Sequence, residues 1–232
     1  MSDPSISPAP ASSTEPQVLL EDRWLLVLCK PAGMPVQADP TGDPDLLLFA
    51  RRRHGHGAQL ELAHRLDRPV SGVVVLAREG AALVHLHGQF RSRQVKKTYW
   101  AVVEGLVAEE GEVELAHALR RDPRAMRARA TESDDPNARL RVRVLARGDR
   151  FTLLEVCPES GLFHQIRAQL AAWGHPIKGD VKYGARRGER DRSIGLHARA
   201  LEFTHPGTHE PVRVVAEPPT EGPWPKLLAL RR

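Results

Sequence analysis

The sequence predicts one α+β domain built on a mixed, mainly antiparallel sheet. Many short apolar or alternating runs are bounded by Gly and Pro, which is typical of strands. Helical patterns are scattered among them and form no regular βαβ units. The chain has 232 residues, of which 41% are hydrophobic, so it can bury a sizeable core. We expect residues 17–232 to form this domain and the polar, Pro- and Ser-rich residues 1–16 to be a flexible tail.

The first half of the chain contains three predicted strands and two predicted helices. In chain order these are a strand entering an irregular loop over 24–36, a helix over 43–55, a buried strand over 73–76, a helix over 80–94 and a strand over 96–105. The first helix has an Asp N-cap and ends at a glycine. The second helix carries Leu83, Leu86 and Phe90 on one face, which predicts that this face packs on the core.

The second half begins with the least regular and most basic segment, 118–149. Its first half is predicted to be an exposed loop, and residues 140–146 an edge strand with Arg141 and Arg143 pointing outward. The remaining elements are a strand over 150–161, a helix over 162–174, a loop over 175–184 and a strand over 196–206. The helix has an apolar stripe of four residues and a glycine at its end; these are Phe163, Ile166, Leu170, Trp173 and Gly174.

The chain is basic, with a formal charge of +5 and a pI of about 9.6, and most of its cations are arginines. Because the planar guanidinium binds phosphate and stacks on bases, this bias favours a polyanionic partner. A GC-rich genome would also raise the arginine content, and composition does not separate the two explanations.

The cysteines and the apolar runs indicate a compartment. Cys29 and Cys157 are the only two cysteines and form no C-x-x-C pattern, which predicts a reducing compartment, here the cytoplasm. The apolar runs are too short to cross a bilayer, and the N-terminus lacks the pattern of a secretory signal. We therefore expect no membrane association.

Polar residues stand directly before the buried strand, in ELAHRLDRPVSGVVVLAR at 61–78. A turn that enters a core strand is a common place for functional side chains, here His64, Arg65 and Asp67. The alternative is purely structural: Asp67 caps the turn and Arg65 pairs with it. The motif alone leaves both interpretations open.

Six segments in a fixed order resemble the RluA-type pseudouridine synthases. They are DRWLLVLCKPAGMPV (22–36), HRLDRPVSG (64–72), KKTYWAVVEG (96–105), SGLFHQIRAQL (160–170), GHPIKGDVKYG (174–184) and LHARALEFTHP (196–206). The resemblance covers about residues 18–216. It implies a pseudouridine synthase fold, with the sheet in two lobes and a central cleft, and an enzyme that converts selected uridines of structured RNA to pseudouridine.

The resemblance implies three catalytic residues. Asp67 would be the carboxylate that attacks the sugar or base, or assists departure of the uracil; the residues do not say which. Arg167 would be the cation that keeps this carboxylate ionised in a closed pocket. Tyr99 would stack on the freed uracil, and its hydroxyl would help the final proton removal.

The same resemblance implies residues that bind the substrate. Arg65 would fill the space that an extruded uridine leaves in the RNA. His64 would brace the turn or touch RNA, and Gly72 would permit the close turn. The remaining expected substrate contacts are Leu196 to the base, together with Lys97 and Gln165. Lys30 matches the first family motif, but no chemistry is assigned to it.

One motif departs from the family pattern. Where relatives have Arg and Thr in T-G-R-T-H-Q-I-R, this chain has Leu162 and Phe163, and Ser71 stands where the family often has Thr. The change removes polar contacts and leaves the substrate identity open. Many relatives also carry an N-terminal S4 module, so we expect this domain to bind RNA itself. The expected phosphate contacts are Arg91, Arg93, Lys96, Lys97 and the arginines from 120 to 129.

Three other functions compete with this one. A metal site at His54, His56 and His64 lacks nearby carboxylates or paired cysteines, and a glycosidase lacks a marked second acid. The main rival is an RNA-binding or RNA-folding protein on the same scaffold with secondary or lost catalysis. We expect no metal and no cofactor, because Asp67 would supply the chemistry directly. The expected partner is ribosomal or transfer RNA, and the expected state is a monomer.

Overall fold

The computed structural model describes residues 15–55 and 59–231, and the predicted tail at 1–16 falls almost wholly outside them. In the described part, no helix is long and apolar enough to span a membrane. The N-terminal elements are β1 (Gln17–Glu21), β2 (Leu25–Lys30), α1 (Leu46–His54), β3 (Glu61–Leu62), β4 (Ser71–Ala77), α2 (Gly80–Arg91) and β5 (Lys96–Glu104). The later elements are β6 (Glu112–Asp122), β7 (Arg127–Thr131), β8 (Ala138–Arg147), β9 (Phe151–Pro158), α3 (Gln165–Ala172), the 3-10 turn η1 (Val181–Tyr183), β10 (Leu196–Thr204), β11 (Pro211–Val215) and α4 (Trp224–Ala229).

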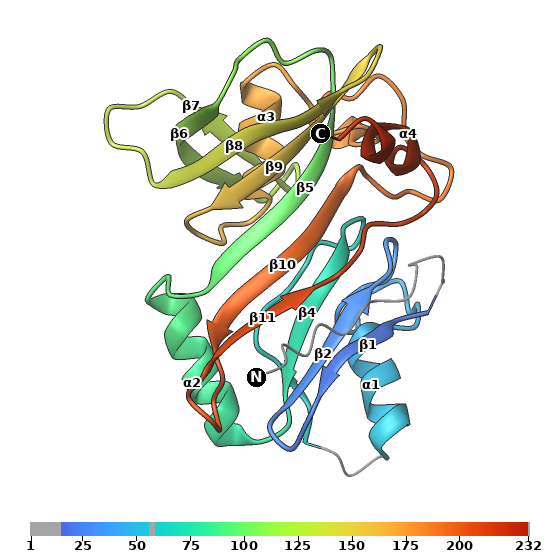
Figure 1. Ribbon diagram of the computed structural model, residues 1–232, viewed down its shortest axis with the longest axis vertical. Helices are drawn as coiled ribbons and strands as arrows, with labels where there is room; N and C mark the ends of the chain where they lie inside the picture. The colour runs from blue at the N-terminus through green and yellow to red at the C-terminus, as the bar shows by residue number, and fades with distance from the viewer. Residues whose placement is uncertain (1–14, 56–58, 232) are drawn as a thin grey trace.

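The strands form one mixed sheet in two lobes, as expected. Its main path runs β1-β2-β4-β10-β5-β9-β8-β6-β7, with β11 beside β10 and β3 beside β4. The β4–β10 pair is parallel and the other strand pairs are antiparallel. Figure 1 shows β6–β9 with α3 and α4 in the upper lobe, and β1–β4, β11, α1 and α2 in the lower lobe. Since β5 and β10 run through both lobes, they fix the lobes relative to each other.

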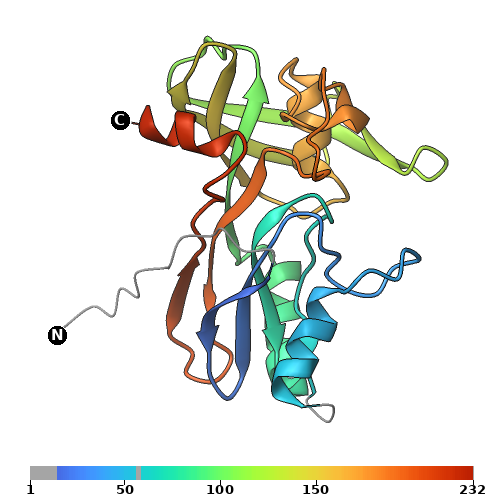
Figure 2. The same cartoon turned by 90° about the vertical axis from the view of Figure 1, so that its right-hand side faces the viewer.

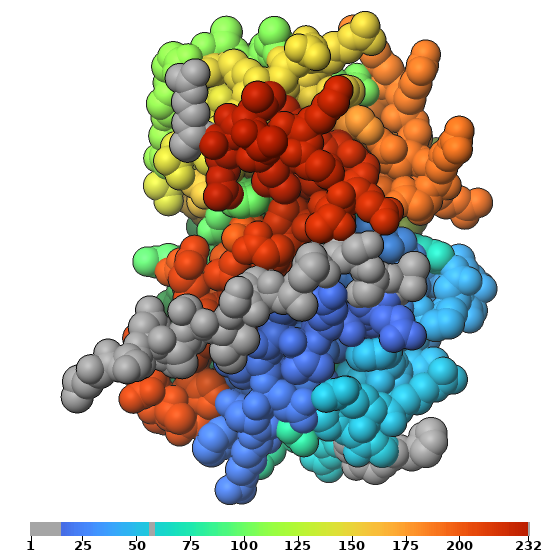
Figure 3. Space-filling view, turned by 45° about the vertical axis from the view of Figure 1, so that its right-hand side comes forward, coloured from blue at the N-terminus to red at the C-terminus, as the bar shows by residue number. Residues whose placement is uncertain are grey.

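Strand β4 is buried along its whole length because helices cover both faces of the lower lobe. Val74 and Leu76 lie in one core cluster with residues of α1, and Val73 and Val75 lie in a second cluster with residues of α2. Figure 1 shows the two helices on opposite sides of the lower lobe, and in Figure 2 α1 lies in front of α2. In the upper lobe, α4 packs on β8 and β9, and Figure 3 shows it in red against that lobe. The buried strand predicted from the Val-rich run is confirmed.

Glycine is required at position 72, where β4 and β10 approach each other. Its φ is +119°, and a Cβ there would overlap the backbone of Ala198 on β10. A side chain would therefore push β4 and β10 apart. Gly72 was expected to permit a close turn; the structure shows that it permits the close approach of a strand distant in sequence.

The helices over 43–55 and 80–94 are confirmed with slightly shorter bounds. The carboxylate of Asp45 accepts the backbone N–H of Leu48 at 2.9 Å, which is the expected N-cap. The third predicted helix is shorter at its start than the apolar stripe suggested. His164 has a φ of +53°, so α3 begins only at Gln165 and Phe163 precedes the helix.

The predicted loop in the first half of 118–149 is wrong. Residues there form a hairpin of β6 and β7, paired from Ala118–Thr131 to Asp122–Arg127. Its inward side chains are mostly small and pack beneath α3, with Leu119, Ala128 and Ala168 in one cluster. Alanine is depleted in strands, so the local pattern did not indicate one.

The predicted edge strand at 140–146 is an internal one. Strand β8 pairs with β9 on one side and β6 on the other. Arg141 and Arg143 do point outward as expected, but they are paired with Glu112 and Glu155 of the neighbouring strands. The alternating arginines thus mark a solvent-facing side of the sheet and not its edge.

Candidate active site

A small cavity lies where the two lobes meet, and its volume is about 100 Å³. Pockets that take drug-sized ligands measure about 300–1,000 Å³, so this cavity has room for one ring and not for a folded RNA element. Both lobes contribute to its wall. The lining residues are Arg65, Leu66, Asp67, Val70, Lys97, Tyr99, Pro158, Ser160, Gly161, Leu162, His164, Gln165, Ile166, Arg167 and Leu196.

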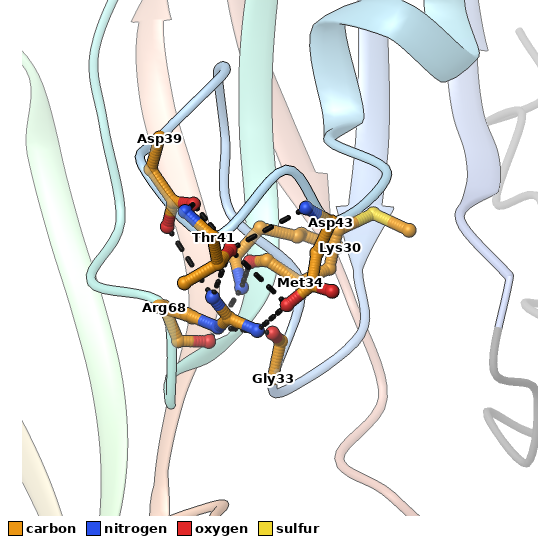
Figure 4. A network of polar contacts seen from close by, with 7 residues as sticks. All are labelled: Lys30, Gly33, Met34, Asp39, Thr41, Asp43 and Arg68. Carbon is orange, nitrogen blue, oxygen red and sulfur yellow. Dashed lines mark hydrogen bonds and ion pairs between the residues drawn. The ribbon is translucent and has the colours of Figure 1, made fainter.

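The turn that carries Asp67 is fixed by the loop after β2. The backbone carbonyl of Asp67 accepts the N–H of Val70 at 3.0 Å, which closes the turn. The next residue, Arg68, donates from Nε to the carbonyl of Gly33 at 2.8 Å and also binds Asp39 and Asp43. Figure 4 shows this network from close by. The loop therefore holds the carboxylate in place from behind.

Lys30 is the buried centre of the same network. Its side chain is fully buried, and Nζ donates to three backbone carbonyls, those of Pro31, Met34 and Arg68, at 2.8–3.2 Å. Burial lowers the pKa of Lys30 to about 7, and the nearby Asp67 carboxylate opposes this shift. With all three donors used, Lys30 braces the turn (Figure 4).

Arg167 brings a positive charge to Asp67 from the other lobe. Its Nη1 donates to Oδ2 of Asp67 at 3.0 Å. The Arg167 side chain is 7% exposed and that of Asp67 is 27% exposed, so the carboxylate is reachable and the guanidinium is not. Among the described residues, none donates a hydrogen bond to Oδ1 of Asp67, which leaves this oxygen available to a substrate. The cation expected beside Asp67 is therefore present.

Asp180, which the sequence reasoning missed, holds Arg167 from behind. Its two oxygens accept Nε and Nη2 of Arg167 at 2.6 and 2.8 Å, and its side chain is 2% exposed. Burial by itself lowers the pKa of Arg167, but the carboxylates of Asp180 and Asp67 outweigh it, so the net shift is upward. The acid in GHPIKGDVKYG was the only signal that could have indicated this partner.

Tyr99 lines the cavity from β5, at the centre of the sheet. Burial raises the pKa of its phenol well above the ordinary value, and the negative charge of Asp67 raises it further. The hydroxyl therefore stays protonated at neutral pH. A protonated phenol can donate a hydrogen bond into the cavity, and the roles in stacking and proton removal that the resemblance implied stay predictions.

The other predicted site residues divide into two groups. Arg65, Lys97 and Leu196 line the cavity, Arg65 being exposed and Leu196 buried. Lys97 donates to the carbonyl of Ser160 at 2.9 Å, and burial, followed by the charge of Arg93, lowers its pKa to about 8. No ion pair between Arg65 and Asp67 occurs among the described residues; Asp67 lies beside His164 and Arg167 instead. The contacts therefore do not support the purely structural interpretation in which Arg65 pairs with Asp67.

His64 and Gln165 are occupied by the protein itself. Nε2 of His64 accepts the N–H of Val75 at 3.1 Å, its ring packs on Phe90, and burial lowers its pKa to about 4. Of its two expected roles, bracing the turn agrees with these contacts, and His64 does not line the cavity. Gln165 lines the cavity, but its amide bonds to Ser160 and to backbone groups, so it shapes the loop before α3.

The metal alternative finds little support in the described residues. No group of three potential metal ligands occurs among them, and His56 lies outside them. The ring of His64 is packed on Phe90, and His54 lies 3.6 Å from Glu21. The two cysteines are free thiols, Cys29 buried and Cys157 half-buried.

The departure from the family motif has a clear structural result. Leu162 is 40% exposed at the cavity rim, whereas the Phe163 ring stacks on His164 with centroids 3.8 Å apart. The Arg121 guanidinium lies 4.6 Å from the centroid of the same ring. Phe163 therefore replaces a polar contact by an aromatic stack within the protein.

The cavity thus places a reachable carboxylate, a buried guanidinium and a phenol around a space the size of one ring. A family model described as RNA pseudouridylate synthase matches residues 24–172. The chain belongs to the RluA-type family of RNA pseudouridylate synthases.

Several curated relatives and solved structures are similar over most of the chain. Ribosomal large subunit pseudouridine synthase C of Vibrio vulnificus is 33% identical, over 86% of this chain and 64% of the relative. The protein of that name in Pasteurella multocida is 34% identical, over 95% of this chain and 69% of the relative. The structure of human RNA pseudouridylate synthase domain containing 1 has a TM-score of 0.75 at 28% identity, and the match covers 92% of this chain and 87% of that one. The chain thus spans about two thirds of the length of these bacterial relatives.

Proposed function

We propose that this protein isomerises selected uridines of structured RNA to pseudouridine at the Asp67 cavity. The bond from the ribose to N1 of the uracil breaks, a bond from the ribose to C5 forms, and a proton passes from C5 to solvent while N1 gains one. No group is added or lost, so the reaction needs no co-substrate. The observation that carries the proposal is the Asp67–Arg167 hydrogen bond inside a cavity for one ring.

Large-subunit ribosomal RNA is the favoured substrate because the bacterial relatives are named for it. The cavity itself does not select one RNA, since it encloses only the base, so transfer RNA is the competing substrate. We further propose that the protein acts as a monomer in the cytoplasm. Mapping pseudouridines in total RNA from cells with and without the gene tests the proposed RNA substrate directly. Loss of a ribosomal site supports the proposal, and an unchanged map contradicts it.

Arg65 has the exposure and position expected of the residue that replaces the extruded base. It is at the rim of the cavity, two residues before Asp67. Extrusion costs a few kcal/mol. We expect Arg65→Ala to lower kcat/KM about 10-fold on folded RNA, equivalent to about 1.4 kcal/mol. The measurement is pseudouridine formation on a folded RNA hairpin.

The matched substrate for this test is an RNA in which the target uridine is already unstacked and unpaired. Because little has to be replaced there, Arg65→Ala should affect it less than about 3-fold. Equal losses on both substrates would show that Arg65 only binds RNA, and no loss on either would remove it from the mechanism.

The exposed arginines fall into a paired and an unpaired set. On β8, Arg141 and Arg143 pair with glutamates, whereas Arg120 and Arg124 of the β6–β7 hairpin have no ion pair within the described ranges. We expect Arg120→Ala/Arg124→Ala to weaken RNA binding and to reduce the slope of log K against log salt by about 1–2. Filter binding at several salt concentrations measures this.

The control variant is Arg141→Ala/Arg143→Ala, which removes the same number of arginines from the paired set. It should leave the slope nearly unchanged. If both double variants reduced the slope equally, binding would follow total charge and not the hairpin.

The rival function, an RNA-folding protein with secondary catalysis, predicts a different result in cells. A strain carrying Asp67→Asn would then grow like wild type although its pseudouridine is lost. The reachable, arginine-bound carboxylate favours the enzymatic proposal, because an RNA chaperone has no use for such a group.

A further inference from the structure

His164 lies directly before α3 with a left-handed backbone conformation, φ +53°. Residues other than glycine rarely adopt this conformation, and they do so where surrounding contacts impose it. The side chain of His164 lines the cavity and is 9% exposed. Neither the family motifs nor the composition assigned it a role, so its contacts are the guide.

Phe163 and Tyr183 hold the His164 ring on two sides, and each of them contacts the β6–β7 hairpin. Phe163 stacks on it, with Arg121 of β6 over the Phe163 ring. The Tyr183 hydroxyl lies 2.9 Å from Nδ1 of His164 and accepts the backbone N–H of Ala128 on β7 at 2.7 Å. The ring is therefore fixed in both tilt and rotation.

The other nitrogen of this ring reaches the catalytic pair. Nε2 of His164 lies 3.1 Å from Nη1 of Arg167, the same nitrogen that donates to Oδ2 of Asp67. A guanidinium has donors and no acceptor, so Nε2 must be the acceptor in this contact. The ring proton is then on Nδ1 and points to the Tyr183 oxygen.

We propose that His164 is a positioning residue for the reaction at Asp67. By accepting the second N–H of Nη1, it fixes the direction of the first, so Arg167 holds Asp67 by one oxygen and leaves the other directed to the cavity. This inference rests on the proposed function. Asp180 fixes the opposite edge of the guanidinium, and His164 completes its coordination.

The electrostatic surroundings keep the imidazole neutral, as the acceptor role requires. Burial lowers the pKa of His164 to about 4; Asp67 opposes this shift, and the charges of Arg167 and Lys182 add to it. A protonated ring would place an N–H against the Arg167 N–H at 3.1 Å, which is closer than Oδ2 of Asp67 at 3.6 Å. At neutral pH the lone pair of Nε2 is available to Arg167.

Two substitutions test this role and are expected to disturb the backbone equally. His164→Leu removes the acceptor, and His164→Gln keeps an amide oxygen of similar reach, while both must adopt the left-handed conformation. We expect His164→Leu to lower kcat at least about 10-fold with KM for RNA changed less than about 2-fold, because a misplaced reacting group costs rate more than binding. His164→Gln should recover most of the rate. Equal losses in both variants, or no loss in the Leu variant, would overturn the proposal.

A second measurement does not depend on turnover. ¹⁵N NMR of histidine-labelled protein without RNA at pH 7 should show His164 protonated on Nδ1 and unprotonated on Nε2. Tyr183→Phe, which removes the acceptor for Nδ1–H, should reduce the population of this tautomer. A proton on Nε2 in the wild type would overturn the inference. A wild type with the expected tautomer but without pseudouridine formation would instead contradict the proposed function.

Discussion

Replacing Asp67 with Asn is expected to lower pseudouridine formation at least about 10³-fold and to change RNA affinity less than about 2-fold. The amide has the same shape and can still accept from Arg167, so the cavity keeps its form. It lacks the negative charge and the basic oxygen that attack or assist at the sugar or base. Product analysis of RNA incubated with excess enzyme measures the loss.

Two outcomes would contradict this prediction. Residual activity within about 10-fold of wild type would mean that another group does the chemistry. Lost RNA binding would mean that Asp67 mainly supports the structure. Arg141→Ala serves as the control for handling and folding, because Arg141 lies on the outer face of β8, away from the cavity, and should keep wild-type turnover.

Replacing Asp180 with Ala is expected to destabilise the protein by about 3–5 kcal/mol. Two nitrogens of the buried Arg167 lose their partners, and water does not reach them freely because both side chains are at most 7% exposed. Arg167 would then be held only at its outer nitrogen. We therefore also expect kcat to fall more than 10-fold. Urea unfolding and single-turnover kinetics measure the two effects.

The control for Asp180→Ala is the exposed pair on the sheet surface, Arg141 and Glu112. Their side chains are 51% and 53% exposed, so Glu112→Gln should change the free energy of unfolding by less than about 1 kcal/mol. If Asp180→Ala cost no more than this control, the buried contacts would not be what holds Arg167.

The main strands and helices were predictable because their sequences carry a strong local pattern. The buried run of β4, the alternation of β5 and the capped α1 each follow from a few adjacent residues. The β6–β7 hairpin was missed because its inward residues are mostly small and gain their burial from α3, which lies far along the chain. The partners of β8 were likewise set by the topology.

The site was predictable to a similar degree. The motifs indicated Asp67, Tyr99 and Arg167, and the structure brings all three to one cavity. Asp180 and His164 were missed although both lie inside the motifs, since each acts through its contact with Arg167, which only the fold reveals. His64 was indicated, but its contacts are with the core.

By itself, the sequence determined the family, most of the elements and the residue types at the catalytic centre, because these depend on short motifs and local periodicity. Only the tertiary structure decided which charges meet. Asp67 and Arg167 are 100 residues apart in the chain, and their contact exists because β5 and β10 hold the two lobes together. A charge pair across such a distance depends on packing and strand order, which local sequence does not encode.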